Sequence, residues 1–200
     1  MTYQELKAEE EQYVMQTYGR FSVALDYGKG AMLWDIEGKR YIDFTSGIGV
    51  NCLGYDHPAL TQAIERQIHK LMHVSNLFTT APMVQAAKTL VTETGMGKVF
   101  FANSGAESNE GAIKLARKYS FDKYGAGRHK IISLWNSFHG RTITTLKATG
   151  QTRFHDYFFP FTEGFDYAIA GDLADLKSKV DDSTCAIMME LIQGEGGVLP

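Results

Sequence analysis

Residues Lys98–Tyr119, KVFFANSGAESNEGAIKLARKY, decide how the rest of the sequence is interpreted. Their first part, Val99–Ala102, is a short apolar run bounded by turn residues, which predicts a buried strand. Ser104 is followed three residues later by Glu107, the pattern of a capping box, and the apolar residues after it recur at helical spacing. The stretch therefore predicts a strand, a tight turn and a long helix.

The start of that helix is a candidate anion site. A helix N-terminus leaves backbone N–H groups without partners and carries the positive end of the helix dipole. Gly105 and Ala106 are too small to shield these groups, and the hydroxyl of Ser104 adds a donor, so we expect a phosphate seat. The same arrangement also forms ordinary corners in α/β proteins. The glycine-rich fingerprints of dinucleotide and nucleoside triphosphate sites are absent.

Composition excludes several classes of protein. The 200 residues are 44% hydrophobic and 22% charged, with a net charge of −3, as in an ordinary globular domain. No basic region indicates a nucleic-acid partner, and no apolar run has membrane-spanning length. Cys52 and Cys185 lack metal-type spacing, so we expect two reduced thiols in a cytoplasmic protein. Glu65, His69 and His73 follow one another at four-residue intervals on a predicted helix, but no fourth ligand is near, and we predict no metal site.

The first 50 residues differ in pattern from the remainder. Residues 3–18 are helical in character, and three short alternating runs follow, which predicts an antiparallel meander. The runs are Phe21–Leu25, Ala31–Trp34 and Tyr41–Phe44. We assign 1–50 to the N-terminal part of a small domain and 51–200 to the first part of a larger one. The glycine-rich loop 45–57 has two possible roles: it lines a functional site, or it only links the two domains.

From Pro58 onward helices and strands alternate. Helices are predicted from Pro58 and Ala81, and strands at 130–134, 166–169 and 185–189, with a short helix at 173–180. This order predicts an α/β fold with a mostly parallel sheet and helices on both of its faces. Such sheets place their sites at the carboxyl ends of the strands.

Three groups of residues follow predicted strands and so face one crevice. The first group is Ser104–Ala106. In the second, Phe138 suits stacking on a flat ring, His139 extends that face, and Arg141 offers a rigid fork to a carboxylate. The third group includes Glu190 and Glu195, whose carboxylates could pair with an arginine or bind an amine. Each feature alone is weak, but together they describe a ring-bearing phosphate and a carboxylated substrate.

Five segments resemble the class III, pyridoxal-phosphate-dependent aminotransferases of fold type I. The likeness runs from about residue 20 and keeps the family order. Among the subfamilies the acetylornithine aminotransferases are most similar, followed by the ornithine aminotransferases. The segments are YIDFTSGIGVNCLGYDHPAL, HVSNLFTTAP, FFANSGAESNEGAIKLARKY, IISLWNSFHGRTITTLKATGQ and MMELIQGEGGVLP.

The resemblance implies pyridoxal 5'-phosphate as cofactor and a role for each matching residue. Ser104, Gly105 and Ala106 would hold the phosphate. Phe138 would stack on the pyridine ring with His139 beside it, and Glu190 and Gln193 would lie near the ring edge. Arg141 would bind a carboxylate of the amino-acid substrate. Glu195 would pair with a second, later arginine and switch that arginine between diamine-type and dicarboxylic substrates.

The resemblance also implies a reaction and its partners. The terminal amino group of N-acetylornithine would move to 2-oxoglutarate, in a homodimer with amino-acid and 2-oxo-acid substrates. A sister activity on ornithine, succinylornithine or 4-aminobutyrate is the first alternative.

A second alternative is an inactive fragment. Leu191 stands where the family usually has proline. The family's Schiff-base lysine, and the aspartate that bonds the pyridine nitrogen, are expected beyond residue 200. We therefore predict no catalytic residue within the chain, which we interpret as the N-terminal half of an enzyme.

Overall fold

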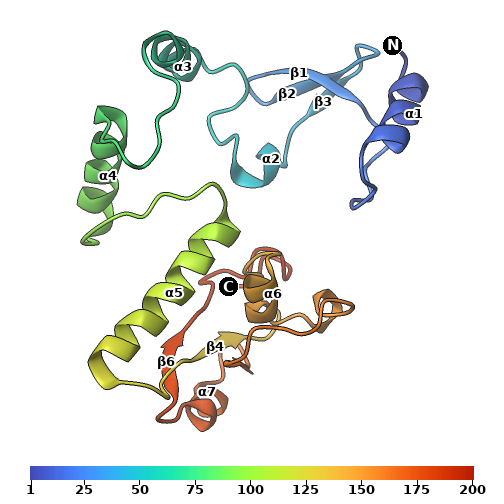
Figure 1. The fold of residues 1–200 in the computed structure, drawn as a ribbon. Helices are drawn as coiled ribbons and strands as arrows, with labels where there is room; N and C mark the ends of the chain where they lie inside the picture. Colours follow the sequence, from blue (N-terminus) through green and yellow to red (C-terminus); the bar gives the residue numbers. More distant parts are fainter. The chain divides into compact units, whose positions relative to one another are not determined.

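The computed structural model describes residues 1–200, which form two compact units, Met1–Thr80 and Ala81–Pro200 (Figure 1). The domain boundary predicted near residue 50 lies within the first of these units. The division into domains 1–50 and 51–200 remains a prediction. No helix in the structure combines the length and the apolar character needed to cross a membrane.

The first unit contains the predicted antiparallel meander. Strands β1 (Leu25–Lys29), β2 (Met32–Asp35) and β3 (Arg40–Ile42) pair in the order β1-β2-β3. The stacked rings of Tyr27 and Trp34, 4.8 Å apart, bridge β1 and β2. The antiparallel meander is confirmed, but its first strand is displaced: β1 shares only Leu25 with the predicted run Phe21–Leu25.

Helix α1 (Tyr3–Tyr13) is shorter than predicted. Thr2 and Glu5 close a capping box at its start. Beyond its end, the amide of Gln16 donates to the carbonyls of Glu10 and Val14. The helix ends where the backbone of its C-cap, Val14, becomes extended, with a φ of −109° and a ψ of 129°.

The glycine-rich loop contains one short helix, α2 (Ser46–Gly49), before α3 (Pro58–Lys70). The carboxylate of Asp43 accepts hydrogen bonds from the hydroxyl and amide of Thr45 and from the hydroxyl of Tyr55. These bonds, that of the Thr45 hydroxyl first, lower the pKa of Asp43 to about 2. One carboxylate therefore connects the two ends of the loop, at Thr45 and Tyr55.

The second unit is the predicted α/β structure. Its three strands are all parallel and pair in the order β5-β4-β6. The strand predicted at 130–134 is confirmed in full, and the other two begin one residue earlier than predicted. The elements are α4 (Ala81–Thr94), α5 (Gly105–Tyr124), β4 (Lys130–Leu134), α6 (Ile143–Ala148), η1 (Thr152–Phe154), β5 (Phe165–Ala168), α7 (Leu173–Lys179) and β6 (Thr184–Ile187).

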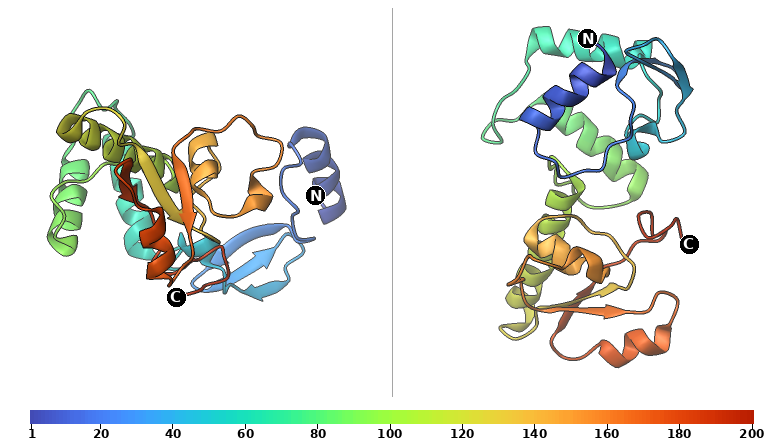
Figure 2. Two further views of the ribbon diagram at one scale, coloured as in Figure 1. Left: turned by 90° about the horizontal axis from the view of Figure 1, so that it is seen from below. Right: turned by 90° about the vertical axis from the view of Figure 1, so that its right-hand side faces the viewer.

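Helices cover both faces of this sheet. On one face, Ile113 of α5 and Ala148 of α6 pack against Ile131 of β4. On the other face, Leu176 of α7 packs against Ile132 and its buried neighbours. The right-hand view of Figure 2 shows α6 and α7 on opposite sides of the strands. The alternation of side chains along β4 thus divides the core into two layers.

The strand predicted at Val99–Ala102 is wrong: these residues form neither a helix nor a strand and belong to no sheet. Phe100 lies against Gly111 of α5, where a Cβ would come within 2.9 Å of the Phe100 ring. The segment therefore packs on a helix. An apolar run forms a strand only when another strand supplies its hydrogen bonds, and none pairs with it here.

Candidate functional site

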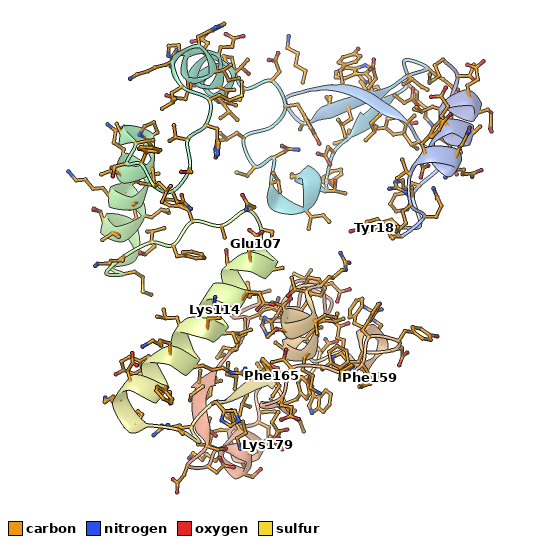
Figure 3. All side chains as sticks on the ribbon, in the orientation of Figure 1. Tyr18, Glu107, Lys114, Phe159, Phe165 and Lys179 are labelled. Atoms are coloured by element: carbon orange, nitrogen blue, oxygen red, sulfur yellow. The ribbon has the colours of Figure 1, made fainter.

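The start of α5 offers open backbone donors. Ser104 is the N-cap, and its Oγ accepts the amide of Glu107 at 3.2 Å. The Glu107 carboxylate, at the first turn of α5 in Figure 3, bonds the amide of Asn103 at 2.6 Å and not that of Ser104, so the predicted capping box is displaced by one residue. The amides of Gly105 and Ala106 donate no hydrogen bond within the chain. A Cβ on Gly105 would meet no atom within 4 Å.

The loop that follows β4 lies directly against this helix start. Gly140 has a φ of +132°, and a Cβ there would come within 2.8 Å of the Ala106 Cβ. Farther along α5, the side-chain Nδ2 of Asn109 donates to the backbone carbonyl of His139 at 2.8 Å. The hydroxyl of Thr142 donates to a carboxylate oxygen of Glu110. The first two groups of predicted site residues are therefore adjacent.

Phe138 presents a half-buried ring from the same loop. Its ring meets that of Phe154 edge-on, with the centroids 5.8 Å apart and the planes at 68°. The guanidinium carbon of Arg141 lies 5.3 Å from the Phe138 centroid. The predicted ring-stacking residue and the predicted carboxylate-binding residue are thus neighbours.

His139 is buried, with 5% of its surface exposed. Its backbone amide donates to the Thr149 hydroxyl at 2.9 Å, but its ring Nε2 has no hydrogen-bond partner. Burial lowers the pKa of His139, against a smaller opposing effect from the negative charge of Glu190. Buried polar atoms in proteins are normally hydrogen-bonded. The free Nε2 of His139 could therefore bond a polar group of a bound ligand.

The loop that follows β6 is bonded to the loop that follows β4. Glu190 accepts the amide of Phe138 with one carboxylate oxygen, at 2.8 Å, and the amide of Gly194 with the other, at 3.1 Å. The buried side chain of Gln193 donates to the carbonyl of Trp135 at 2.9 Å. The third predicted group thus joins the first two at one edge of the sheet.

Asn136 was not predicted as part of the site. It has a φ of +67°, and its side-chain amide donates to the carbonyl of Gly196 at 2.9 Å. A Cβ on Gly196 would come within 2.5 Å of Asn136. Asparagine and glycine therefore let the two loops approach closely.

Glu195 is held by two side chains that the sequence did not indicate. Its carboxylate accepts from Nε2 of Gln151 at 2.5 Å and from a guanidinium nitrogen of Arg153 at 2.9 Å. The three residues lie on a polar cavity of about 460 Å³. Its lining residues are Trp135, Asn136, Gly150, Gln151, Thr152, Arg153, Glu195 and Gly196.

These features define an α/β protein in which an open helix start, an aromatic loop and a carboxylate-bearing loop meet at the carboxyl ends of parallel strands. Residues 13–200 match the model of the family described as "Aminotransferase class-III". The chain belongs to this family, whose members use pyridoxal phosphate.

The chain is similar to curated relatives over about half of their length. It is 56% identical to an acetylornithine aminotransferase of Haemophilus ducreyi over 199 residues, which are 99% of this chain and 51% of the relative. It is 49% identical to an acetylornithine aminotransferase of Methanocaldococcus jannaschii, over 94% of this chain and 48% of the relative.

Solved structures show the same fold. The ornithine aminotransferase of Toxoplasma gondii ME49 superposes with a TM-score of 0.94 at 33% identity, over 100% of this chain and 48% of that one. A second structure of the Toxoplasma gondii enzyme, described as having partial occupancy of pyridoxal phosphate at its active site, gives a TM-score of 0.92 at 33% identity, over 99% of this chain and 47% of that one.

Proposed function

We propose that this chain supplies the cofactor-binding and substrate-binding loops of a pyridoxal-phosphate-dependent aminotransferase acting on N-acetylornithine. The reaction would move the terminal amino group of that substrate to 2-oxoglutarate. The observation that carries the proposal is the convergence of three loops: Ala106 touches Gly140, and Glu190 bonds the amide of Phe138. The curated relatives quoted above, named for this reaction, favour N-acetylornithine.

The residues at the start of α5 fit the cofactor's phosphate. Open amides at Gly105 and Ala106, the Ser104 hydroxyl and the helix dipole provide the donors and positive potential that an anion needs. The space beside Gly105 leaves room for its oxygens. We assign the phosphate to these three residues.

The aromatic loop fits the cofactor's ring. Phe138 would stack on it, and His139 would lie beside it with its neutral, unpartnered Nε2 available to a polar group. Glu190 fixes the Phe138 backbone, and Gln193 fixes the strand end at Trp135, so both would support the ring edge. When bound, the cofactor would serve as the electron sink for the carbanion formed from the amino acid.

Substrate recognition falls to Arg141 and Glu195. The Arg141 fork suits a substrate carboxylate, and its position over Phe138 would place that carboxylate next to the ring face. Glu195 lines the polar cavity and would discriminate between substrates by charge.

Steady-state kinetics on the full-length gene product test this function. We expect kcat/KM for N-acetylornithine to exceed that for ornithine, N-succinylornithine and 4-aminobutyrate, with 2-oxoglutarate as acceptor. A preference for another of these donors would assign the sister activity, and no turnover of any of them would refute the proposed reaction.

Parallel measurements on the 200-residue chain test the alternative of an inactive fragment. We expect it to show no turnover, and absorbance spectra with added pyridoxal phosphate would report whether it binds the cofactor. Sedimentation of the full-length product would test the expected homodimer. Cell fractionation would test the expected cytoplasmic location.

A further inference from the structure

Glu110 contacts the loop that follows β4 but has no part in the proposed function. It lies on α5 beyond Glu107, in the stretch of helix between the Glu107 and Lys114 labels of Figure 3. One of its carboxylate oxygens accepts a hydrogen bond from the hydroxyl of Thr142, at 2.5 Å. A carboxylate acceptor makes such a bond stronger than one between two neutral groups. The bond joins α5 to the residue that directly follows Arg141.

Consecutive residues of α5 bond the loop on both sides of Arg141. Before it, the side-chain Nδ2 of Asn109 donates to the backbone carbonyl of His139 at 2.8 Å. After it, Glu110 accepts from Thr142. The backbone of Arg141 is therefore connected to one rigid helix at either end.

The hydroxyl of Thr142 serves this bond and the start of α6 at the same time. Its proton is donated to Glu110. Its oxygen accepts the backbone amide of Thr145 at 3.3 Å and lies 2.7 Å from the Thr145 hydroxyl oxygen. The helix cap and the bond to Glu110 thus use different parts of one group. Removal of the Glu110 carboxylate would break the connection to α5 and leave the cap of α6 in place.

The residues that would hold the cofactor are anchored separately. The amide of Phe138 bonds Glu190, and the proposed phosphate donors lie at the first turn of α5. Neither arrangement involves Glu110. Loss of its carboxylate should therefore affect Arg141 and leave the sites for the cofactor's ring and phosphate intact.

We propose that Glu110 is a positioning residue for substrate binding, which through Thr142 holds Arg141 where its guanidinium meets a substrate carboxylate. The proposal rests on the proposed function, because Arg141 is assigned there to that carboxylate. An arginine whose backbone is already fixed loses less conformational freedom when it binds. The expected effect is therefore on the affinity for carboxylates and not on the rate of amino transfer.

The primary test compares Glu110→Ala with Glu110→Gln in the full-length product loaded with pyridoxal phosphate. We expect Glu110→Ala to weaken the binding of glutarate, a non-reacting dicarboxylate, about fivefold by calorimetry. Glu110→Gln should retain most of the affinity, because its carboxamide oxygen still accepts the Thr142 hydroxyl. Charge alone predicts the opposite sign, since removal of a negative charge by either substitution should strengthen the binding of an anion. Stronger or unchanged binding in Glu110→Ala, or an equal loss in Glu110→Gln, would overturn the proposal.

Steady-state kinetics separate positioning from a general structural role. In Glu110→Ala, KM should rise about fivefold for both 2-oxoglutarate and N-acetylornithine, each of which has a carboxylate, while kcat and the Kd of pyridoxal phosphate change less than about twofold. A purely structural role predicts losses of cofactor affinity and thermal stability together with the rise in KM. Asp122→Ala is the matched control, since it removes an exposed acid from the same helix and should change none of these values.

A double variant tests the route through Thr142. Thr142→Val removes the hydroxyl, so it should lower glutarate affinity as well as the stability that the α6 cap provides. In that background Glu110→Ala should weaken glutarate by less than about twofold more, because the bond is already lost. A further loss as large as in the wild-type background would show that Glu110 acts independently of Thr142 and would refute the proposal.

The glutarate measurement requires no turnover and so keeps this inference distinct from the proposed reaction. Weaker binding in Glu110→Ala supports the role of Glu110 even if the protein transaminates none of the donors above. Unchanged binding in a protein that does turn over N-acetylornithine would refute that role and leave the proposed function standing. A wild-type protein that binds no glutarate would overturn the assignment of Arg141 and this inference together.

Discussion

The backbone amide of Phe138 donates to a carboxylate oxygen of Glu190 at 2.8 Å, across 52 residues of sequence. The second carboxylate oxygen accepts the amide of Gly194. A carboxylate with both oxygens bonded to backbone amides fixes two loops at once. The position of the aromatic ring that would stack on the cofactor therefore depends on a residue that follows a different strand.

Replacement of Glu190 by Gln should loosen this connection. The carboxamide keeps one acceptor oxygen and turns an N–H₂ group toward the other amide, which leaves a donor facing a donor. We expect a loss of about 1–3 kcal/mol in the free energy of unfolding, and weaker pyridoxal phosphate binding. Urea denaturation and cofactor titration measure the two effects. Glu163→Gln, at an exposed site, is the control, and equal behaviour of the two variants would contradict the role of Glu190.

Gly140→Ala should disrupt the contact between the aromatic loop and α5. The residue has a φ of +132°, and the added methyl would lie 2.8 Å from the Ala106 Cβ and 2.6 Å from the Thr145 hydroxyl oxygen. Backbone strain and overpacking together should lower stability by about 2–4 kcal/mol. Thermal or urea unfolding measures this loss. In the control Gly194→Ala, the methyl meets nothing within 4 Å and should have little effect.

Ser104→Ala tests the start of α5 in two ways. The hydroxyl caps the helix by accepting the amide of Glu107, so its loss should cost about 1 kcal/mol of stability. The hydroxyl is also proposed to donate a hydrogen bond to the cofactor's phosphate. The affinity for pyridoxal phosphate should therefore fall by more than the loss of the helix cap alone would cause. Ser104→Thr keeps the hydroxyl and should restore most of both. If Ser104→Ala alters only stability, the hydroxyl is a cap and not a ligand.

Sequence periodicity was sufficient to predict the three strands of the sheet in the second unit. Strand β4 (Lys130–Leu134) is confirmed residue for residue, because a short, mostly apolar run bounded by turn residues is typical of a strand buried on both faces of a parallel sheet. Helix α5 was equally clear from its cap and from Gly125 at its end. The rule that parallel strands place sites at their carboxyl ends then brought together the two predicted groups that follow β4 and β6. The group at Ser104–Ala106 follows no strand and reaches them through the contact of α5 with Gly140.

The network around Glu195 could not be predicted in the same way. Gln151 and Arg153 reach Glu195 because the chain returns from α6 beside Trp135, where Gly150 forms a bridge to that residue. A Cβ on Gly150 would lie 2.0 Å from the carbonyl oxygen of Leu134. This approach depends on tertiary packing, for which a single glycine is the only local signal. Likewise, the segment Val99–Ala102 has the composition of a strand, but composition does not supply a hydrogen-bonding partner.

His139 should make the stability of the second unit depend on pH. Burial lowers its pKa below the ordinary value of about 6.5, so the folded protein favours the neutral ring while the unfolded chain binds the proton more readily. Stability from this residue is therefore complete above about pH 6.5 and is lost as the pH falls through the lower, folded-state pKa. Urea midpoints measured between pH 5 and 8 should fall on the acid side in the wild type and less steeply in His139→Gln. Removal of the Glu190 charge by Glu190→Gln should lower the pKa of His139 further, because that charge opposes the effect of burial. NMR titration of the ring would show this, and a His139 pKa at or above the ordinary value would contradict the buried, neutral imidazole on which the cofactor site is built.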